Sequence, residues 1–196
     1  MKEFLEGLEE QLRSLVKNAQ GKRVSFFVED ESRFGLMPIT RRRITAKGVK
    51  PIQSVQQVFE SYYIYGAVEP LTGESFFLEM PRLDSDCFQV FLNEFCSGYS
   101  DRFIIMLLDN GSIHKAKKLV IGDNVGFLFL PPYSPELNPI ERLWQDIKGR
   151  IGFWLYETLE GLEERVAGLL NGYRPSTIAS LTGYRYFIEA VNAVST

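Results

Sequence analysis

Three acidic residues follow or lie within segments that are far apart in the chain. Asp30 follows Ser-Phe-Phe-Val-Glu, Asp109 follows Phe-Ile-Ile-Met-Leu-Leu, and Glu141 ends Pro-Pro-Tyr-Ser-Pro-Glu-Leu-Asn-Pro-Ile-Glu. Carboxylates that meet at one point repel each other unless a cation lies between them, and carboxylate oxygens are the ligands that hard divalent ions take. The three residues therefore predict a metal site of the kind used in Mg²⁺-dependent phosphodiester chemistry.

The two aspartates also have simpler explanations. Asp30 could be a polar strand end that leads into a turn, and Asp109-Asn110-Gly111 could be an ordinary turn. Neighbouring residues on an extended chain point to opposite faces, so only one of Asp30 and Glu31 can face a given site. We assign Asp30 to the site and expect Glu29 and Glu31 to lie at the surface.

Glu141 has an alternative role as part of a helix cap. Asn138 as N-cap, Pro139 at the first helical position and Glu141 two residues later match a capping box. The apolar stripe of the helix leaves Glu141 on a neighbouring face with Lys148, where it can look across a cleft at both aspartates. Ligation of a metal and capping are compatible, so both roles stay open.

The net charge of −3 argues mildly against binding to nucleic acid, but the charges are unevenly distributed. We predict that two basic groups and Lys148 contact DNA phosphates: Arg41, Arg42, Arg43, Lys47 and Lys50, and then His114, Lys115, Lys117 and Lys118. A solvated surface is the alternative for each group. His114 is the only histidine, and it could instead steady the metal ligands or be an ordinary surface residue.

The hydrophobic pattern predicts an α/β fold with one core in 196 residues. The expected strands cover 24–28, parts of 55–68, 75–80, 102–108 and 125–130, with a loop or irregular hairpin over 31–50. The expected helices cover 4–16, the segment from Asp84 or Ser85 to about Gly98, 113–120, the segment from Ile140, 157–172 and 176–193. Strands come first and then alternate with helices, which predicts a mixed sheet with helices packed on it.

The compartment can also be predicted from the sequence. Acidic residues near the start exclude a secretory signal, and no stretch reaches the roughly 18 apolar residues of a membrane span. Cys87 and Cys96 lack the spacing of a zinc site or a disulfide framework, so we expect reduced thiols. The chain is therefore expected to be cytoplasmic, with no membrane partner.

The chain resembles the catalytic domain of DDE transposases of the IS630/Tc1/mariner superfamily. The matching segments are Val-Glu-Asp-Glu-Ser-Arg-Phe-Gly-Leu (28–36), Leu-Asp-Asn-Gly-Ser-Ile-His-Lys (108–115) and Leu-Pro-Pro-Tyr-Ser-Pro-Glu-Leu-Asn-Pro-Ile-Glu-Arg-Leu-Trp (130–144). The resemblance implies an RNase H-like fold, a five-stranded mixed sheet flanked by helices, with the first strand beside the fourth. It places the catalytic and metal-binding acids on Asp30, Asp109 and Glu141, with two Mg²⁺ or Mn²⁺ ions roughly 4 Å apart between them.

The resemblance also implies a function and partners. Family members cut DNA at transposon ends and join the freed end to target DNA, often as dimers, after an N-terminal helix-turn-helix region has recognised the ends. Residues 1–20 are expected to be the tail of such a region, absent here, and residues 21–196 the catalytic domain. A separately encoded helix-turn-helix polypeptide is then an expected partner, besides DNA and a second copy of the chain.

Two other functions stay open at this stage. One is a truncated, non-catalytic product that binds DNA or a full transposase and acts as an inhibitor. The other is a host nuclease of the RNase H-like fold, against which the proline-rich segment before Glu141 argues. Turnover in a divalent metal separates the first from an enzyme, and preference for RNA–DNA hybrids identifies the second.

Overall fold

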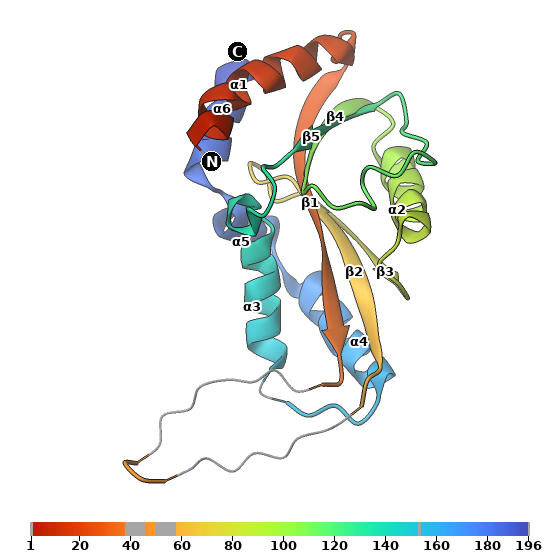
Figure 1. Ribbon diagram of the computed structural model, residues 1–196, viewed down its shortest axis with the longest axis vertical. Helices are drawn as coiled ribbons and strands as arrows, with labels where there is room; N and C mark the ends of the chain where they lie inside the picture. Colours follow the sequence, from red (N-terminus) through yellow and green to blue (C-terminus); the bar gives the residue numbers. More distant parts are fainter. Residues whose placement is uncertain (1, 38–45, 50–57, 153, 196) are drawn as a thin grey trace.

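A five-stranded mixed sheet forms the centre of the molecule (Figure 1). The computed structural model describes residues 2–37, 46–49, 58–152 and 154–195. The strand order is β3-β2-β1-β4-β5, in which β1 pairs parallel with β4 and antiparallel with β2. The strands are β1 Arg23–Gly35, β2 Ser61–Val68, β3 Ser75–Met80, β4 Arg102–Leu108 and β5 Val125–Phe129. The predicted mixed sheet, with its first strand beside its fourth, is confirmed.

Helices cover both faces of this sheet, with α2 on one side and most of the others on the opposite side (Figure 1). The helices are α1 Lys2–Val16, α2 Ser85–Gly98, α3 Glu141–Ile151, α4 Leu159–Gly172, α5 Pro175–Thr182 and α6 Arg185–Val194, with short 3₁₀ turns at Lys17–Ala19 and Pro135–Leu137. No helix in the described part of the chain is long and apolar enough to cross a lipid bilayer. Cys87 and Cys96 are free thiols.

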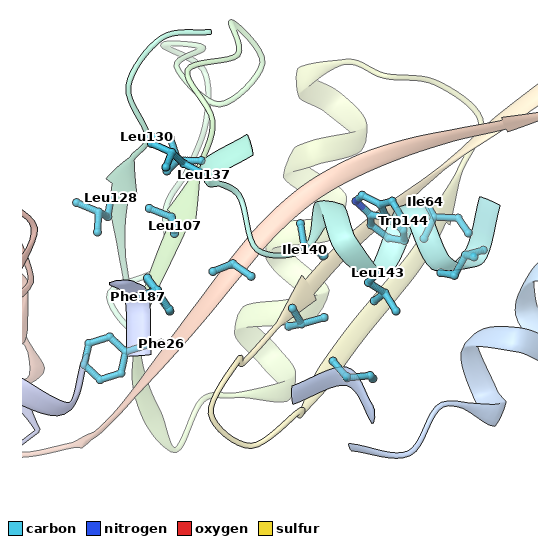
Figure 2. Packing of buried hydrophobic residues seen from close by; sticks show 14 of the residues in the cluster. Phe26, Ile64, Leu107, Leu128, Leu130, Leu137, Ile140, Leu143, Trp144 and Phe187 are labelled. Atoms are coloured by element: carbon cyan, nitrogen blue, oxygen red, sulfur yellow. The ribbon is translucent and has the colours of Figure 1, made fainter. Parts of the chain in front are cut away.

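The alternation of side chains along β1 divides the core into two layers. Phe26 and Val28 face the layer that holds α3, whereas Phe27 faces the aromatic layer under α2. Figure 2 shows Leu143 and Trp144 of α3 among the apolar side chains of the first layer. Because β1 and β4 are covered on both faces, their apolar runs are nearly continuous rather than alternating with polar residues.

Helix α1 is packed into the same core as the sheet. Leu8 and Leu12 are fully buried and share a cluster with Phe187 and Val191 of α6, which lies beside α1 (Figure 1). The amphipathic pattern of residues 4–16 therefore predicted the helix correctly. The division of function at residue 20 stays a prediction.

The structure corrects the expected end of β1. The strand continues through Asp30 to Gly35, because its second half pairs antiparallel with β2 from Val28↔Val68 to Gly35↔Ser61. Residues 31–35 are thus regular strand, not the loop or irregular hairpin expected for them. Pairing with β4, however, ends at Val28↔Leu107, so Asp30 lies beyond the carboxyl end of the neighbouring parallel strand.

Two predicted helices were also wrong in part. Residues 113–120 form turns, in which Ile113 and Leu119 pack on the α2 layer at a spacing that one helical face cannot supply. The predicted helix over 176–193 is two helices, α5 and α6, because the backbone becomes extended at Tyr184. The other expected elements match within a few residues.

The start of α2 offers a test of local stability. The carboxylate of Asp84 accepts hydrogen bonds from the backbone N–H groups of Asp86 and Cys87, at 3.1 and 2.9 Å. We expect Asp84→Ala to lower the free energy of unfolding by about 1 kcal/mol, because two N–H groups lose their partner. Urea denaturation would measure this, with Glu94→Ala on the exposed face of α2 as a control that should change stability little.

Candidate active site

The three acids predicted from the sequence line one cavity of about 560 Å³. Asp30 comes from β1, Asp109 from the residue after β4, and Glu141 from the first turn of α3. The remaining walls are formed by the turn after Asp109 and the proline-rich loop before α3: Asn110, Gly111, Lys115, Leu130, Pro131, Pro132, Tyr133, Ser134, Pro135 and Asn138. The fold thus brings together residues separated by more than a hundred positions in the sequence.

Asp30 is held by an aromatic side chain of α3. The indole Nε1–H of Trp144 donates a hydrogen bond to Oδ2 of Asp30 at 3.1 Å. Burial, together with the charges of Glu31 and Glu141, raises the pKa of Asp30 well above its ordinary value. The ionised carboxylate is therefore costly here unless a cation offsets it.

Gly66 leaves the space that Trp144 occupies. It lies opposite Asp30 in the register of β1 and β2, and a Cβ atom there would lie 2.7 Å from the Trp144 ring and 2.9 Å from Phe77. We expect Gly66→Ala to cost about 1–3 kcal/mol, because the indole must shift in a close-packed layer. Thermal or urea unfolding would measure the loss. Gly168→Ala is a matched control, because its Cβ meets no atom within 4 Å and helix α4 gains a better helix former. Equal stability of the Gly66→Ala protein would contradict this packing argument.

Asp109 has one carboxylate oxygen fixed and remains half-exposed. Its Oδ1 accepts a hydrogen bond from the Gly111 N–H at 2.6 Å and lies 2.8 Å from Nδ1 of His114. The bond with His114, aided by Gly111, holds the pKa of Asp109 below its ordinary value even though partial burial opposes this. A Cβ at position 111 would lie 2.8 Å from Oδ1, so this close approach requires glycine. Asp109 thus presents an ionised group to the cavity.

His114 is buried, which corrects its predicted role as a DNA contact. The residue is 3% exposed, and its Nε2 lies 3.1 Å from Oε1 of Glu31 and 3.6 Å from Oε2 of Glu29. Burial opposes the charged ring, but hydrogen bonds with Asp109 and Glu31 outweigh it and raise the pKa of His114 to about 11. Both ring nitrogens are engaged inside the protein, so no phosphate can reach them.

Glu29 and Glu31 are not surface residues, contrary to expectation. Glu29 is fully buried, and the side chain of Glu31 is 7% exposed. Both project to the α2 face of β1, opposite to Asp30, as the alternation of a strand requires. Burial and the neighbouring Glu31 raise the pKa of Glu29 well above its ordinary value.

The capping box predicted for α3 forms only in part. Oδ1 of Asn138 accepts a hydrogen bond from the Ile140 N–H at 3.4 Å, but the Asn138 N–H donates to the Pro135 carbonyl rather than to Glu141. The side-chain N–H of Asn138 donates to the backbone carbonyl of Glu29 at 2.8 Å, and the helix begins after Ile140. This bond joins the loop before α3 to β1, next to Asp30. It leaves the Glu141 carboxylate at the cavity wall, near the positive end of the helix.

The three lysines of the second predicted basic group, Lys115, Lys117 and Lys118, differ in their surroundings. Lys115 is exposed at the cavity wall, contacts Asn110 and lies 4.9 Å from the centre of the Phe129 ring. Lys117 is exposed as well, whereas Lys118 pairs with Asp86 at 2.5 Å.

The other predicted DNA contacts lie in two further places. Lys148 is partly buried, 5.6 Å from the centre of the Phe34 ring, and burial lowers its pKa although Glu141 and Asp30 oppose this. Lys47 is exposed. Arg41, Arg42, Arg43 and Lys50 lie outside the described residues.

The donor set at the cavity fits hard divalent cations. Asp30, Asp109 and Glu141 supply carboxylate oxygens alone, which Mg²⁺ and Mn²⁺ accept, and burial together with the charges of Glu31 and Glu141 raises the pKa of Asp30, a cost that a bound cation would offset. Within the described chain, the group whose ligand atoms all lie within 4.8 Å of one another is instead Glu29, Glu31 and His114. The three acids at the cavity are more widely spaced than this group.

Sequence reasoning missed several residues that shape this cavity. The hydrogen bonds of Trp144, Asn138 and Glu31 join residues distant in sequence, so no local pattern indicates them. Tyr133 is fully exposed at the cavity wall and has a φ of 55°, an unfavourable conformation for a bulky residue. The proline-rich sequence of residues 131–139 predicted a loop there, but it did not indicate this conformation of Tyr133.

Solved structures of similar fold cover nearly the whole chain. The Mos1 strand transfer complex aligns over 97% of this chain with a TM-score of 0.66 and 14% identity. The Mos1 mariner paired end complex with Mn gives 0.66 and 15%, and the one with Mg gives 0.64 and 13%. This chain spans only 59–60% of those proteins. At this identity the likeness concerns the fold, an RNase H-like transposase fold.

Sequence comparison identifies the family. An uncharacterised protein of Sinorhizobium fredii, y4pE/y4sA, is 40% identical over 84 residues, which are 42% of this chain and 62% of that protein. The sequence over residues 25–159 matches the family described as DDE superfamily endonuclease. That match covers more than half of the chain and includes Asp30, Asp109 and Glu141, so the chain belongs to the DDE superfamily endonucleases.

Proposed function

We propose that this protein is a transposase catalytic domain that cleaves DNA strands and transfers them with two divalent metal ions. The observation that carries the proposal is that Asp30, Asp109 and Glu141 line one cavity in a member of the DDE endonuclease family. The Mos1 complexes, which share the fold, include strand transfer and paired end complexes and forms with Mn and with Mg.

The metal ligands in this proposal are the three acids. Two Mg²⁺ or Mn²⁺ ions would supply an activated hydroxyl nucleophile and neutralise charge at the phosphate, so no protein nucleophile is required. The protein holds the ligands in place: Trp144 donates to Asp30, Gly111 donates to Asp109, and Asn138 fixes the segment that leads to Glu141. Lys115 at the cavity wall is suited to binding a DNA phosphate.

DNA is the proposed substrate, and the exposed lysines beside the cavity support this. Lys115 and Lys117 lie on the turns that follow Asp109, and Tyr133 at the cavity wall offers an aromatic face to an unstacked base. The proposal also includes two protein partners, a second copy of this chain in a homodimer and a separately encoded helix-turn-helix polypeptide. Neither partner changes the chemistry proposed for the cavity.

The direct experiment is a cleavage assay with the purified chain. Supercoiled plasmid and a duplex with a free 3′ end should be nicked and joined in Mn²⁺ or Mg²⁺, and neither reaction should proceed in EDTA. An RNA–DNA hybrid tested in parallel should be a poorer substrate. DNA binding without turnover in any divalent metal would replace this function with the non-catalytic one, and preference for the hybrid would replace it with a host nuclease.

The proposed phosphate contacts make a quantitative prediction about salt. We expect Lys115→Ala and Lys117→Ala each to weaken DNA binding and to reduce the slope of log affinity against log salt by about 1, because one phosphate contact is lost. Fluorescence anisotropy with a labelled duplex would measure both quantities. Lys22→Ala is a control, because Lys22 precedes β1 at the end of the sheet opposite to the cavity. An unchanged slope in both variants would remove these lysines from the interface.

A further inference from the structure

Asp109 begins a segment that no strand pairing fixes to β1. The parallel ladder between β1 and β4 ends at Val28↔Leu107, and β5 does not begin until Val125. Asp30 and Asp109 must nevertheless keep a fixed separation to share metal ions. Some other contact must therefore hold the start of this segment against β1.

His114 forms that contact. One ring nitrogen lies 2.8 Å from Oδ1 of Asp109, and the other lies 3.1 Å from Oε1 of Glu31, the residue after Asp30 in β1. The ring of Phe88 on α2 supports the imidazole from the side, with centroids 4.6 Å apart. The imidazole and the Glu31 side chain are buried, whereas Asp109 is half-exposed, so water is excluded mainly from the hydrogen bond with Glu31.

We propose that Glu31 and His114 are positioning residues that orient Asp109 toward the metal ions. The bridge and the Gly111 N–H both engage Oδ1 of Asp109, a residue that lines the cavity, so Oδ2 would be the oxygen that binds a metal ion. Neither Glu31 nor His114 lines the cavity, so both act through Asp109. This inference rests on the proposed function, because it assumes that Asp109 binds a metal ion.

The same residues could be mistaken for a separate metal site, because Glu29, Glu31 and His114 lie within 4.8 Å of one another. A histidine that binds a metal needs a ring nitrogen that is not already engaged in a hydrogen bond. Here Nδ1 lies 2.8 Å from Oδ1 of Asp109 and Nε2 lies 3.1 Å from Oε1 of Glu31, so both ring nitrogens already have a partner. This geometry is that of a bridge between Asp109 and β1 rather than of a cation site.

The bridge can be observed without any metal or activity. His114 is the only histidine, so in a protein purified without a histidine tag its ring nitrogens give one assignable set of NMR signals. In EDTA we expect Asp109→Asn to shift the Nδ1 signals and Glu31→Gln to shift those of Nε2, because each substitution changes the atom that faces that nitrogen. Nδ1 signals unmoved by Asp109→Asn, or Nε2 signals unmoved by Glu31→Gln, would overturn the proposal.

Matched substitutions test the effect on metal binding. In His114→Asn the amide can replace Nδ1 and still donate to Asp109, whereas in His114→Gln it can replace only Nε2. We expect His114→Asn to retain most of the Mn²⁺ affinity and His114→Gln to lose about 10- to 100-fold, as is usual when a partner of a metal ligand is removed. Glu31→Gln keeps an acceptor and should bind Mn²⁺ better than Glu31→Ala. Electron paramagnetic resonance would give the affinities, and unfolding in EDTA would check that each variant is folded.

The outcomes separate this inference from the proposed function. Mn²⁺ affinity that is equal in His114→Asn and His114→Gln, both folded, would overturn the positioning role while leaving the catalytic proposal intact. Loss of a bound ion in Glu29→Gln, with the ions at Asp109 retained, would also overturn it by revealing a metal in the cluster. A wild-type protein that binds no Mn²⁺ would refute both proposals, whereas Mn²⁺ binding without DNA cleavage would refute the catalytic proposal alone.

Discussion

Asp109→Ala should abolish metal-dependent DNA cleavage while leaving the protein folded. Asp109 is the most exposed of the three acids and presents an ionised carboxylate to the cavity, so its loss removes a ligand that no neighbouring group can replace. We expect the cleavage rate of Asp109→Ala to fall by about 10³-fold or more, which corresponds to a loss of about 4 kcal/mol of transition-state stabilisation. Nicking of supercoiled plasmid in Mn²⁺, followed over time, would measure it.

The same assay should give equally severe losses for Asp30→Asn and Glu141→Gln. Glu136→Gln is the matched control, because Glu136 is an exposed acid just before α3 that does not line the cavity. It should leave the rate unchanged. Full activity of the folded Asp109→Ala protein would exclude Asp109 from the mechanism and leave the cavity without its proposed chemistry.

Asp30→Asn is expected to make the metal-free protein more stable, although it removes activity. Burial and the charges of Glu31 and Glu141 raise the pKa of Asp30 in the folded state, so the folded protein binds its proton more tightly than the unfolded chain does. Stability therefore falls as the pH rises above about 4, the ordinary pKa of an aspartate. Asparagine avoids that cost and can still accept the Trp144 hydrogen bond, so we expect a gain of about 1–2 kcal/mol at pH 7.

Metal should reverse this difference. At 100 times the dissociation constant, a bound ion stabilises the folded state by about 2.7 kcal/mol, and Asp30→Asn should lose most of this gain. Urea denaturation in EDTA and in Mn²⁺, at pH 7 and below pH 4, would measure both effects. Asp123→Asn, at an exposed acid away from the cavity, should behave like wild type. A metal-free Asp30→Asn protein less stable than wild type at pH 7 would contradict the argument that burial and neighbouring charges make the ionised Asp30 costly.

Local sequence patterns were sufficient for most of the fold. Apolar runs buried on both faces predicted β4 and the first half of β1, and the spacing of Phe88, Phe91 and Phe95 predicted α2. The pattern failed where tertiary pairing decided the outcome. Residues 31–35 are strand because β2 pairs with them, and 113–120 form turns because side chains of α2 hold that segment in place.

The amino-acid sequence by itself determined which acids could meet, since Asp30, Asp109 and Glu141 stand in segments that resemble one family. It did not determine how they are held. The hydrogen bonds from Trp144 to Asp30, from Asn138 to the Glu29 carbonyl and between His114 and Glu31 span 114, 109 and 83 residues. Burial in the tertiary structure decided the roles of Glu29, Glu31 and His114. At a surface these side chains would be ordinary solvated charges, whereas inside the fold each of them must find a partner or lose its charge.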